Sequence, residues 1–462
     1  MSGRKAGRGN VMQGHPPEFA QAMERGQKGD FQGALLLFRK AMARRPHADI
    51  ASNIGYCLRR IGREEEARKS YSQALSINPL HADALANFSA MLVATQEFEE
   101  AERILRKAES VVSVNATLLV NFFTVLFCQA RFDEAEGIVR RAVAINPNLP
   151  QARKNLSDLL LMRGQMEEGF ELFETRNVAL DLKLGDNVNA APWRGEDLRG
   201  KTLFALTEQG YGDTLLFLRY GALVRKVGGR MVLLCRKELR RLLTNCPVVD
   251  ALAHEGESLP SFDYHISLLS LPHMFRTSLA TIPNQVPYIA VETALAAQWK
   301  TRIDAAAGGK LKVGVSWAGS ASFWDDRRRS PGLKMVEPIF QTPSAHFFLL
   351  QMGEGRAALK DWVPPANVTD LGPEITDFAD TAAMMANLDV VVSSCTSTAH
   401  LAGALGRPVW VMLHPVPYWV WMVGRPDTPW YPSARLFRQS EMGKWDSVVE
   451  AIRENLGKLT VG

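Results

Sequence analysis

Small and large apolar residues repeat with a period of about 34 over the first third of the chain. Small residues stand 33 or 34 positions apart, and each is followed four positions later by a large apolar residue. The small residues are Ala34, Ala67, Ala101, Ala135 and Gly169, and the large ones are Phe38, Tyr71, Leu105, Val139 and Phe173. Small side chains let two helices cross closely, so the pattern predicts a helical solenoid of about five units over residues 15–176. We expect residues 1–14 to form a flexible tail.

A second, polar periodicity runs through the same repeats. Its members lie 34 residues apart, on the first helix of successive units, and they are Asn53, Asn87, Asn121 and Asn155. A side-chain amide offers both a donor and an acceptor, so a row of amides can bind the backbone of an extended peptide acceptor. The alternative is that each asparagine caps or supports a turn within its own repeat. The repeats resemble the tetratricopeptide repeat, and the row resembles the asparagine ladder in the repeat domain of the eukaryotic O-GlcNAc transferase.

The pattern changes after a polar connector over residues 177–199. From residue 200 on, short apolar runs alternate with helical segments, which predicts parallel sheets. We expect one half over residues 200–308 and a second over residues 309–462. Strands are predicted over Thr202–Thr207, Met231–Cys235, Lys312–Trp317, Phe347–Gln351, Val390–Ser393 and Val409–Leu413, and an apolar segment near Tyr264–Leu269 extends the first sheet. Helices are predicted over Asp213–Lys226, Ala379–Ala386, Ala399–Leu405 and Asp446–Leu456. The expected fold is an α-solenoid followed by an α/β region of GT-B architecture, with two Rossmann-like halves.

Composition and charge narrow the class of protein. The 462 residues are 46% hydrophobic and 22% charged, which is typical of a folded chain with more than one domain. A net charge of +5 without a basic face predicts no nucleic-acid partner. The five cysteines are odd in number and lack metal-binding spacing, so we expect a reducing compartment and no metal site. Because no secretory signal or membrane-spanning run is visible, we expect a cytoplasmic protein.

Residues 389–413 hold the most unusual transition in the chain, where a valine run ends in small hydroxyl residues. A helix that opens there offers unpaired N–H groups and a partial positive charge, which suit a diphosphate. The stretch contributes the candidate residues Thr396, Ser397, Thr398, His400 and Gly403. The alternative is ordinary N-capping with close strand–helix packing. Its histidine is either a donor to phosphate or a structural residue.

A second stretch follows the predicted strand that ends at Trp317. A loop containing Gly319 leads to three adjacent arginines, of which Arg327 and Arg329 are the candidates for a phosphate. A guanidinium matches phosphate oxygens with two parallel hydrogen bonds. The alternative is a solvated basic turn that pairs with the two preceding aspartates.

A third stretch, TEQGYGDTLLF, follows the first predicted strand. Gly210 and Gly212 bracket its turn, and Asp213 stands at the start of the next helix. A carboxylate in this position can remove a proton from an acceptor hydroxyl. The alternative is that Asp213 only caps the helix.

Six blocks spread over nearly the whole chain resemble a bacterial family that joins tetratricopeptide repeats to a glycosyltransferase region related to heptosyltransferases. The blocks are EQGYGDTLLFLRY, SFDYHISLLSLP, WAGSASFWDDRRRS, DFADTAAMMANLD, AHLAGALGRPVW and DTPWYPSARLFRQ. The resemblance implies an inverting transferase whose C-terminal half binds a nucleotide sugar and whose N-terminal half faces the acceptor. It gives Asp213 the role of the base. Two positions depart from the family pattern, since Cys395 replaces a common aspartate and Met352 a common lysine, and either change bears on donor choice or turnover.

Together these residues predict a glycosyltransferase that moves a sugar to a Ser or Thr hydroxyl of a protein held by the repeats. Flagellin is suggested as an acceptor by analogy with related bacterial proteins. The arginines and the helix start can stabilise the departing nucleotide diphosphate, so no metal or resident cofactor is required. Two alternatives remain, a transferase that acts on a glycan and a non-catalytic repeat scaffold with a degenerate transferase domain.

Overall fold

The computed structural model describes residues 15–111, 115–176, 190–254, 256–323 and 325–459. The predicted tail and residues 177–189 of the predicted connector lie outside the described residues. The chain forms two compact units, one ending at Leu156 and the other starting at Ser157. The predicted repeat range therefore ends within the second unit.

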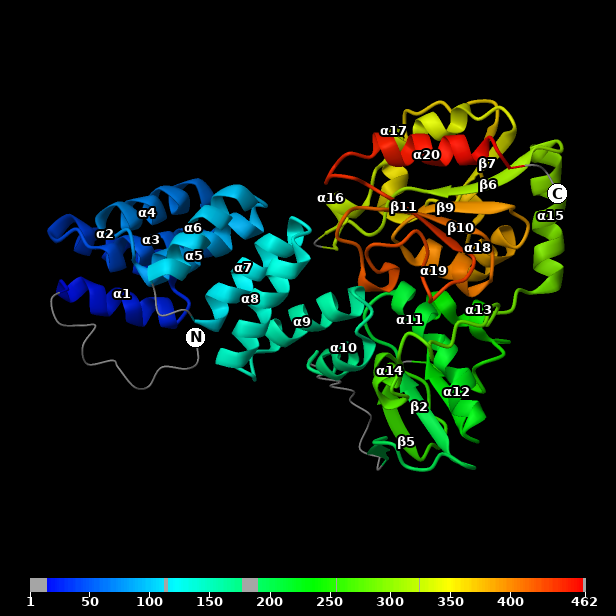
Figure 1. Ribbon diagram of the computed structural model, residues 1–462, viewed down its shortest axis with the longest axis horizontal. Helices are drawn as coiled ribbons and strands as arrows, with labels where there is room; N and C mark the ends of the chain where they lie inside the picture. Colours follow the sequence, from blue (N-terminus) through cyan, green and yellow to red (C-terminus); the bar gives the residue numbers. More distant parts are fainter. Residues whose placement is uncertain (1–14, 112–114, 177–189, 255, 324, 460–462) are drawn as a thin grey trace. The chain divides into compact units, whose positions relative to one another are not determined.

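The first unit is a solenoid of helices. They are α1 (Pro17–Gln27), α2 (Phe31–Arg44), α3 (Ala48–Arg60), α4 (Glu64–Ile77), α5 (Ala82–Ala94), α6 (Phe98–Val111), α7 (Ala116–Cys128), α8 (Phe132–Ile145) and the start of α9 (Pro150–Met162) (Figure 1). Consecutive helices pack in pairs, α1 with α2, α3 with α4, α5 with α6 and α7 with α8. The predicted helical solenoid is confirmed.

Small residues explain why these helices pack so closely. The alanines at the repeated small position are fully buried, and so are the alanines seven residues later in each unit, namely Ala34, Ala67, Ala101 and Ala135, and Ala41, Ala74, Ala108 and Ala142. Gly55 shows the same effect between α3 and α4, because a Cβ atom there would lie 2.7 Å from the ring of Tyr71. Any larger side chain at these positions would force the helices apart.

The second unit contains two sheets in which every strand pair is parallel. The five-stranded sheet has the order β1 (Ala191–Pro192), β5 (Tyr264–Ser267), β2 (Thr202–Leu206), β3 (Arg230–Leu234), β4 (Ala251–Ala253). The six-stranded sheet has the order β11 (Ala434–Arg438), β10 (Val409–Leu413), β9 (Val390–Ser394), β6 (Leu311–Ser316), β7 (Ala345–Leu349), β8 (Val368–Asp370). Parallel sheets were the prediction, and they place the carboxyl ends of neighbouring strands at one edge of each sheet.

Helices and short 3₁₀ turns connect these strands. The α-helices are α10 (Met166–Phe173), α11 (Tyr211–Phe217), α12 (Gly221–Lys226), α13 (Arg240–Leu243), α14 (Leu271–Met274), α15 (Thr293–Ala307), α16 (Asp326–Arg329), α17 (Leu333–Val336), α18 (Phe378–Met385), α19 (Ser397–Ala404) and α20 (Asp446–Leu456). The 3₁₀ turns are η1 (Leu218–Tyr220), η2 (Lys237–Leu239), η3 (Leu268–Ser270), η4 (Glu337–Gln341), η5 (Gly353–Leu359), η6 (Gly372–Glu374) and η7 (Trp419–Trp421). Figure 1 shows α17 and α20 on one face of the six-stranded sheet, and α18 and α19 on the other.

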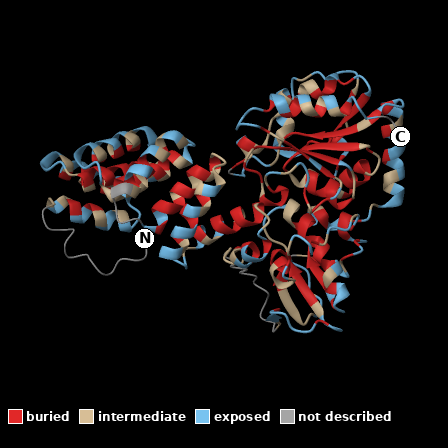
Figure 2. Ribbon diagram, viewed as in Figure 1, coloured by how far each residue is buried: buried red, intermediate tan, exposed pale blue. Residues whose placement is uncertain are grey.

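Alternation along the strands builds the core of the six-stranded sheet. Val313 and Val315 of β6 pack in one buried cluster with Val392 of β9 and Ile452 of α20. The strands of the six-stranded sheet are largely buried, as are β2 and β3 of the five-stranded sheet, whereas β1 is exposed (Figure 2). A sheet that is covered on both faces needs near-continuous apolar strands, which is the pattern that predicted them.

Most predicted strands are present, and the differences have simple causes. The prediction missed β1, β4, β8 and β11, of which β1, β4 and β8 contain only two or three residues and show no readable alternation. The predicted helix over Asp213–Lys226 is divided into α11, η1 and α12. Gly221 lies at the last junction, where a Cβ atom would overlap the backbone oxygen of Val248.

Candidate functional site at the carboxyl ends of the strands

Asp213 lies in the first turn of α11, shortly after β2. Its Oδ2 accepts a hydrogen bond from the Gly210 backbone N–H at 2.9 Å, and its Oδ1 accepts one from the Tyr418 hydroxyl at 2.7 Å. Tyr418 follows β10, so the carboxylate joins elements of both sheets. Burial raises the pKa of Asp213 above its ordinary value, although the hydrogen bond from Tyr418 lowers it in part. A carboxylate with raised proton affinity is suited to act as a general base.

His400 lies on α19, directly against the turn that carries Asp213. A Cβ atom at Gly212 would come 2.8 Å from Cδ2 of His400, so a glycine allows this close approach of α11 and α19. The Nδ1 atom of His400 lies 3.0 Å from the Tyr431 hydroxyl. Burial and the charges of nearby arginines lower the pKa of His400 to about 3, so the ring is neutral at pH 7. These contacts favour the structural role for this histidine.

The first turn of α19 offers hydroxyl groups at the carboxyl end of β9. Thr396, Ser397 and Thr398 are half-buried. Thr396 occupies the N-cap position, but its side chain makes no hydrogen bond to the helix backbone. The N-capping alternative is therefore absent at this residue, and its hydroxyl lies 3.3 Å from the hydroxyl of Ser393 instead. Gly403, at the far end of α19, serves packing, because a Cβ atom there would overlap the ring of Tyr431.

Arg329 lies beside the start of α19. Its Nη1 donates to the backbone oxygen of Cys395 at 3.2 Å, and its Nε donates to Asp326 at 3.0 Å. Gly319 lies against the same guanidinium, because a Cβ atom there would overlap Arg329. Arg327, in contrast, is exposed on α16. The structure thus brings one of the two candidate arginines to the hydroxyl-rich turn.

Trp317 and the loops around it lie at the same edge of the six-stranded sheet. The Trp317 side chain is fully buried. The Oε1 atom of Gln351 accepts hydrogen bonds from the backbone N–H groups of Trp317 and Ala318, each at 2.9 Å. The loops after β6 and β7 are therefore held together by one buried amide. Met352, the next residue, is exposed.

Cys395 is buried, and it is not a reactive thiol. Its Sγ accepts a hydrogen bond from the Trp421 indole N–H at 3.0 Å. Burial raises the pKa of the Cys395 thiol, so the sulfur stays protonated near neutral pH. An aspartate here would introduce a charge into a buried position.

Three site residues escaped the sequence analysis. Arg219 is fully buried, donates to the Tyr288 hydroxyl at 2.9 Å and lies over the ring of Tyr431. Arg176 pairs with Glu208 at 2.9 Å. Arg219, Arg176 and Tyr418 follow no periodicity or spacing from which the sequence analysis could have identified them. The ion pair with Arg176 also means that Glu208 is not an independent base.

The asparagine row lies on the first helices of the repeats. The Nδ2 atom of Asn53 donates to the backbone oxygen of Asp49 in its own helix at 2.8 Å. The Nδ2 atom of Asn121 donates to the backbone oxygen of Ala86 in α5 at 3.4 Å. Asn87 is half-buried on α5. The Nδ2 atom of Asn155 is buried and has no hydrogen-bond partner within the described part of the chain. Part of the row thus supports the repeats, while Asn155 keeps a donor unused.

The fold defines a class of protein in which a helical-repeat solenoid precedes a region of parallel sheets. The family model of the tetratricopeptide repeat matches residues 19–84, so the solenoid carries tetratricopeptide repeats. No helix among the described residues is long and apolar enough to cross a membrane.

The chain is similar to Protein FlbA of Caulobacter vibrioides, with 29% identity over 311 residues. The match covers 62% of this chain and 52% of the relative, so the chain spans about half the length of the curated relative it matches.

Solved structures also resemble part of the chain. MamA has 19% identity and a TM-score of 0.31, covering 33% of this chain and 91% of that chain. The tetratricopeptide-repeat protein TTC0263 of Thermus thermophilus has 21% identity and a TM-score of 0.31, with coverage of 36% and 93%. The pilF protein of Pseudomonas aeruginosa has 17% identity and a TM-score of 0.35, with coverage of 46% and 85%.

Proposed function

We propose that this protein is an inverting glycosyltransferase of GT-B architecture that uses a nucleotide sugar to glycosylate a Ser or Thr hydroxyl of a protein. One observation carries the proposal. Three stretches far apart in the sequence meet at the carboxyl ends of parallel strands, through the contacts of Gly212 with His400, Asp213 with Tyr418 and Arg329 with Cys395. Ligands of parallel sheets bind at that edge.

The proposed reaction assigns one step to each group. The Asp213 carboxylate takes the proton of the acceptor hydroxyl while the hydroxyl oxygen forms a bond to the anomeric carbon of the sugar. The bond between that carbon and the phosphate oxygen breaks, and its electron pair leaves with the nucleotide diphosphate. Arg329 and the hydroxyl-rich first turn of α19 stabilise the charge on the diphosphate. Attack from the face opposite the leaving group inverts the anomeric carbon.

In this proposal the tetratricopeptide repeats bind the protein that is glycosylated. Repeat solenoids present extended surfaces that bind other proteins and seldom carry out chemistry. The half-buried amides of Asn53, Asn87 and Asn121 support a role for the asparagine row in binding a peptide backbone, since an amide can both donate and accept. Flagellin is the acceptor to test first.

A second candidate is a non-catalytic scaffold. Both carboxylate oxygens of Asp213 are already hydrogen-bonded within the chain, as expected for a residue that only caps α11. A scaffold would bind the protein partner through its repeats and have no nucleotide-sugar turnover.

The test combines donor binding with turnover. Thermal-shift measurements with UDP-, ADP-, GDP- and CMP-sugars identify the donor, since a ligand that binds only the folded state raises its stability. Transfer to flagellin is then followed by intact-mass spectrometry. The variant to compare with the natural chain is Asp213→Asn, and its matched control is Asp30→Asn. Asp30 also caps a helix, because its Oδ1 accepts from the Gly33 backbone N–H at 2.8 Å. Binding of none of the four donors would overturn the proposal, and donor binding without transfer or hydrolysis would favour the scaffold.

A further inference from the structure

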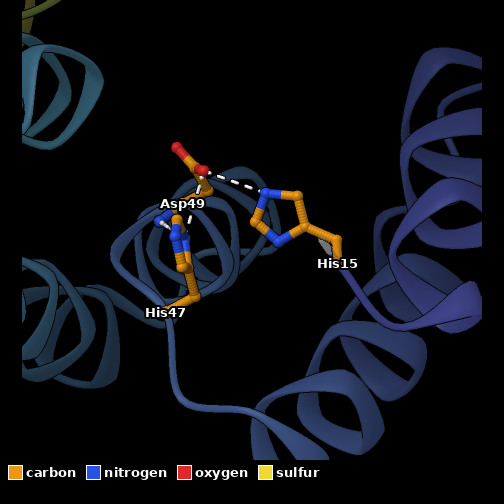
Figure 3. A group of neighbouring side chains, drawn as sticks. All are labelled: His15, His47 and Asp49. Atoms are coloured by element: carbon orange, nitrogen blue, oxygen red, sulfur yellow. Dashed lines mark hydrogen bonds and ion pairs between the residues drawn. The ribbon is translucent and has the colours of Figure 1, made fainter. Parts of the chain in front are cut away.

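Three histidines from successive repeats converge on one carboxylate in the solenoid. His15 precedes α1, His47 is the N-cap of α3, and His81 is the N-cap of α5. Asp49 lies between them in the first turn of α3. Figure 3 shows the His15 and His47 rings beside the Asp49 carboxylate. This group is separate from the residues proposed to bind the donor.

The distances match the size of a metal-binding site. Nε2 of His15 and Nδ1 of His47 each lie 3.1 Å from Oδ2 of Asp49. One ligand atom of each residue lies within 4.8 Å of the other two. In a tetrahedral zinc site with bonds of about 2.0 Å, ligand atoms are about 3.3 Å apart. Only a small movement of the two rings is needed to place all three atoms around one ion.

His47 places a ring nitrogen lone pair close to the Asp49 carboxylate, an arrangement that a cation between them would stabilise. Its Nδ1 accepts a bond from the Asp49 backbone N–H at 3.3 Å, which requires a lone pair on that nitrogen. The same lone-pair nitrogen lies 3.1 Å from a carboxylate oxygen, which also carries only lone pairs. Two acceptors at this distance repel each other unless a proton or a metal ion lies between them. Because the nitrogen has one lone pair, an ion bound there would replace the 3.3 Å bond from the backbone N–H.

His15 can become a ligand with little disturbance. Its Nδ1 is buried and has no hydrogen-bond partner among the described residues. Metal binding at Nε2 requires the ring proton to be on Nδ1. No described donor occupies the Nδ1 position, so only the contact of Nε2 with Asp49 is exchanged. Stacking on Phe19, with ring centroids 4.2 Å apart, holds the ring in place.

His81 orients the carboxylate. Its Nδ1 accepts from the Ala84 backbone N–H at 3.1 Å, so its Nε2 carries the proton and donates to Oδ1 of Asp49 at 2.6 Å. That bond leaves Oδ2, the oxygen near the other two histidines, for the ion. Carboxylate ligands of metals are commonly held by such a partner.

We propose that His15, His47 and Asp49 bind one divalent transition-metal ion of the zinc class, with His81 holding the carboxylate. Imidazole and carboxylate ligands together favour Zn²⁺, Co²⁺ or Ni²⁺ over Mg²⁺ and Ca²⁺. The His47 side chain is 42% exposed, which gives the ion access from solvent. The ion would tie the segment before α1 to α3 and so fasten the first repeat to the second.

The experiment uses the full-length protein after removal of metal with a chelator. Equilibrium dialysis against ZnCl₂ is expected to give one ion per chain, and CoCl₂ is expected to give the visible absorption of a protein-bound cobalt ion. Asp49→Asn and His47→Asn should each lower zinc affinity at least about tenfold. Asparagine is a good N-cap residue, so His47→Asn keeps the start of α3 intact. His81→Asn should weaken zinc by about 10- to 100-fold without abolishing the site.

Two controls keep the result interpretable. His273→Gln changes a histidine of α14, in the second compact unit, and should leave zinc binding unchanged. Circular dichroism of each variant shows whether its helices are retained, and zinc should raise the melting temperature of the natural chain but not that of Asp49→Asn. If the folded natural chain binds no stoichiometric zinc, or if both ligand variants bind it equally well, the group is only a hydrogen-bonded cluster and the proposal is wrong.

Discussion

The hydroxyl of Tyr418 donates a 2.7 Å hydrogen bond to Oδ1 of Asp213, a residue 205 positions earlier in the chain. Burial raises the pKa of Tyr418 well above its ordinary value, so the phenol keeps its proton and remains a donor near neutral pH. The bond joins the loop after β10 to the helix after β2. It therefore ties the proposed base to the element next to the proposed donor site.

Asp213→Asn should separate catalysis from capping. An asparagine keeps the shape of the side chain, and its oxygen can still accept from the Gly210 backbone N–H, so the melting temperature should change little. Loss of a general base should lower the transfer rate by about 10²–10⁴-fold, measured by intact-mass spectrometry with the identified donor. A variant that melts early but transfers at the normal rate would show that Asp213 is only a cap.

Tyr418→Phe should move the acidic limb of the pH–rate profile. The base must be ionised, so kcat/KM rises with pH as Asp213 loses its proton. The Tyr418 hydrogen bond lowers the pKa of Asp213, and its removal should shift this limb to higher pH. Tyr56→Phe in the solenoid is the matched control. An unshifted limb would mean that the titrating group is not Asp213.

His400 should make the second unit sensitive to acid. The pKa of His400 is about 3 in the folded chain, below the ordinary value of 6.5. Between these two values the unfolded chain binds a proton that the folded chain does not. The free energy of unfolding should therefore fall by about 1.4 kcal/mol for each pH unit below 6.5.

Tryptophan fluorescence can measure this effect, because all ten tryptophans lie between Trp193 and Trp445, in the second unit. The comparison is between the natural chain and His400→Gln, in which the contribution of the histidine is absent. The raised pKa of Asp213 acts with the opposite sign but is present in both proteins, so it cancels. Equal losses of stability in the two proteins on acidification would contradict the prediction.

Arg329→Ala should weaken binding of the nucleotide diphosphate. A hydrogen bond to a charged group contributes about 1.5–3 kcal/mol, so the loss should be about 10- to 100-fold in isothermal titration. Arg327→Ala should have a smaller effect, because Arg327 is exposed while Arg329 contacts the turn before α19. The charge control is Arg453→Ala on α20, where Arg453 pairs with Glu450. Equal affinity in the natural chain and Arg329→Ala would remove the donor role of this arginine.

The asparagine row should respond unevenly to substitution. Asn155→Leu removes a buried amide whose Oδ1 accepts from Nε2 of Gln151 at 2.7 Å and whose Nδ2 is unpartnered among the described residues. The loss of that hydrogen bond is offset by the removal of the unpaired donor, so stability should change little. Asn121→Ala loses a hydrogen bond to α5 and should lower stability by about 0.5–1.5 kcal/mol. Both variants should bind flagellin more weakly in a pull-down with purified proteins. Normal flagellin binding by the variant with all four asparagines changed to alanine would dismiss the row as an acceptor site.

The helical repeats could be predicted from the sequence because their information is local and repeated. Ala67 and Ala101 pack in the same way within their own units, so one spacing of 34 residues marks every crossing. The main strands could also be predicted from local sequence. In β2 and β9 a continuous apolar run indicates a strand that is buried on both faces. A strand of three residues such as β4 carries too few positions for a pattern.

Only the tertiary structure decided which side chains meet. The pairing of Asp213 with Tyr418, the packing of Arg219 over the ring of Tyr431 and the convergence of His15 and His47 on Asp49 join residues from separate elements. Such contacts depend on how the elements pack, and packing leaves no periodicity in the chain. The sequence therefore determined where the helices and main strands lie and which stretches are chemically unusual. The fold decided that Arg329 reaches the turn before α19 while Arg327 remains exposed, because the two side chains leave the short helix α16 in different directions.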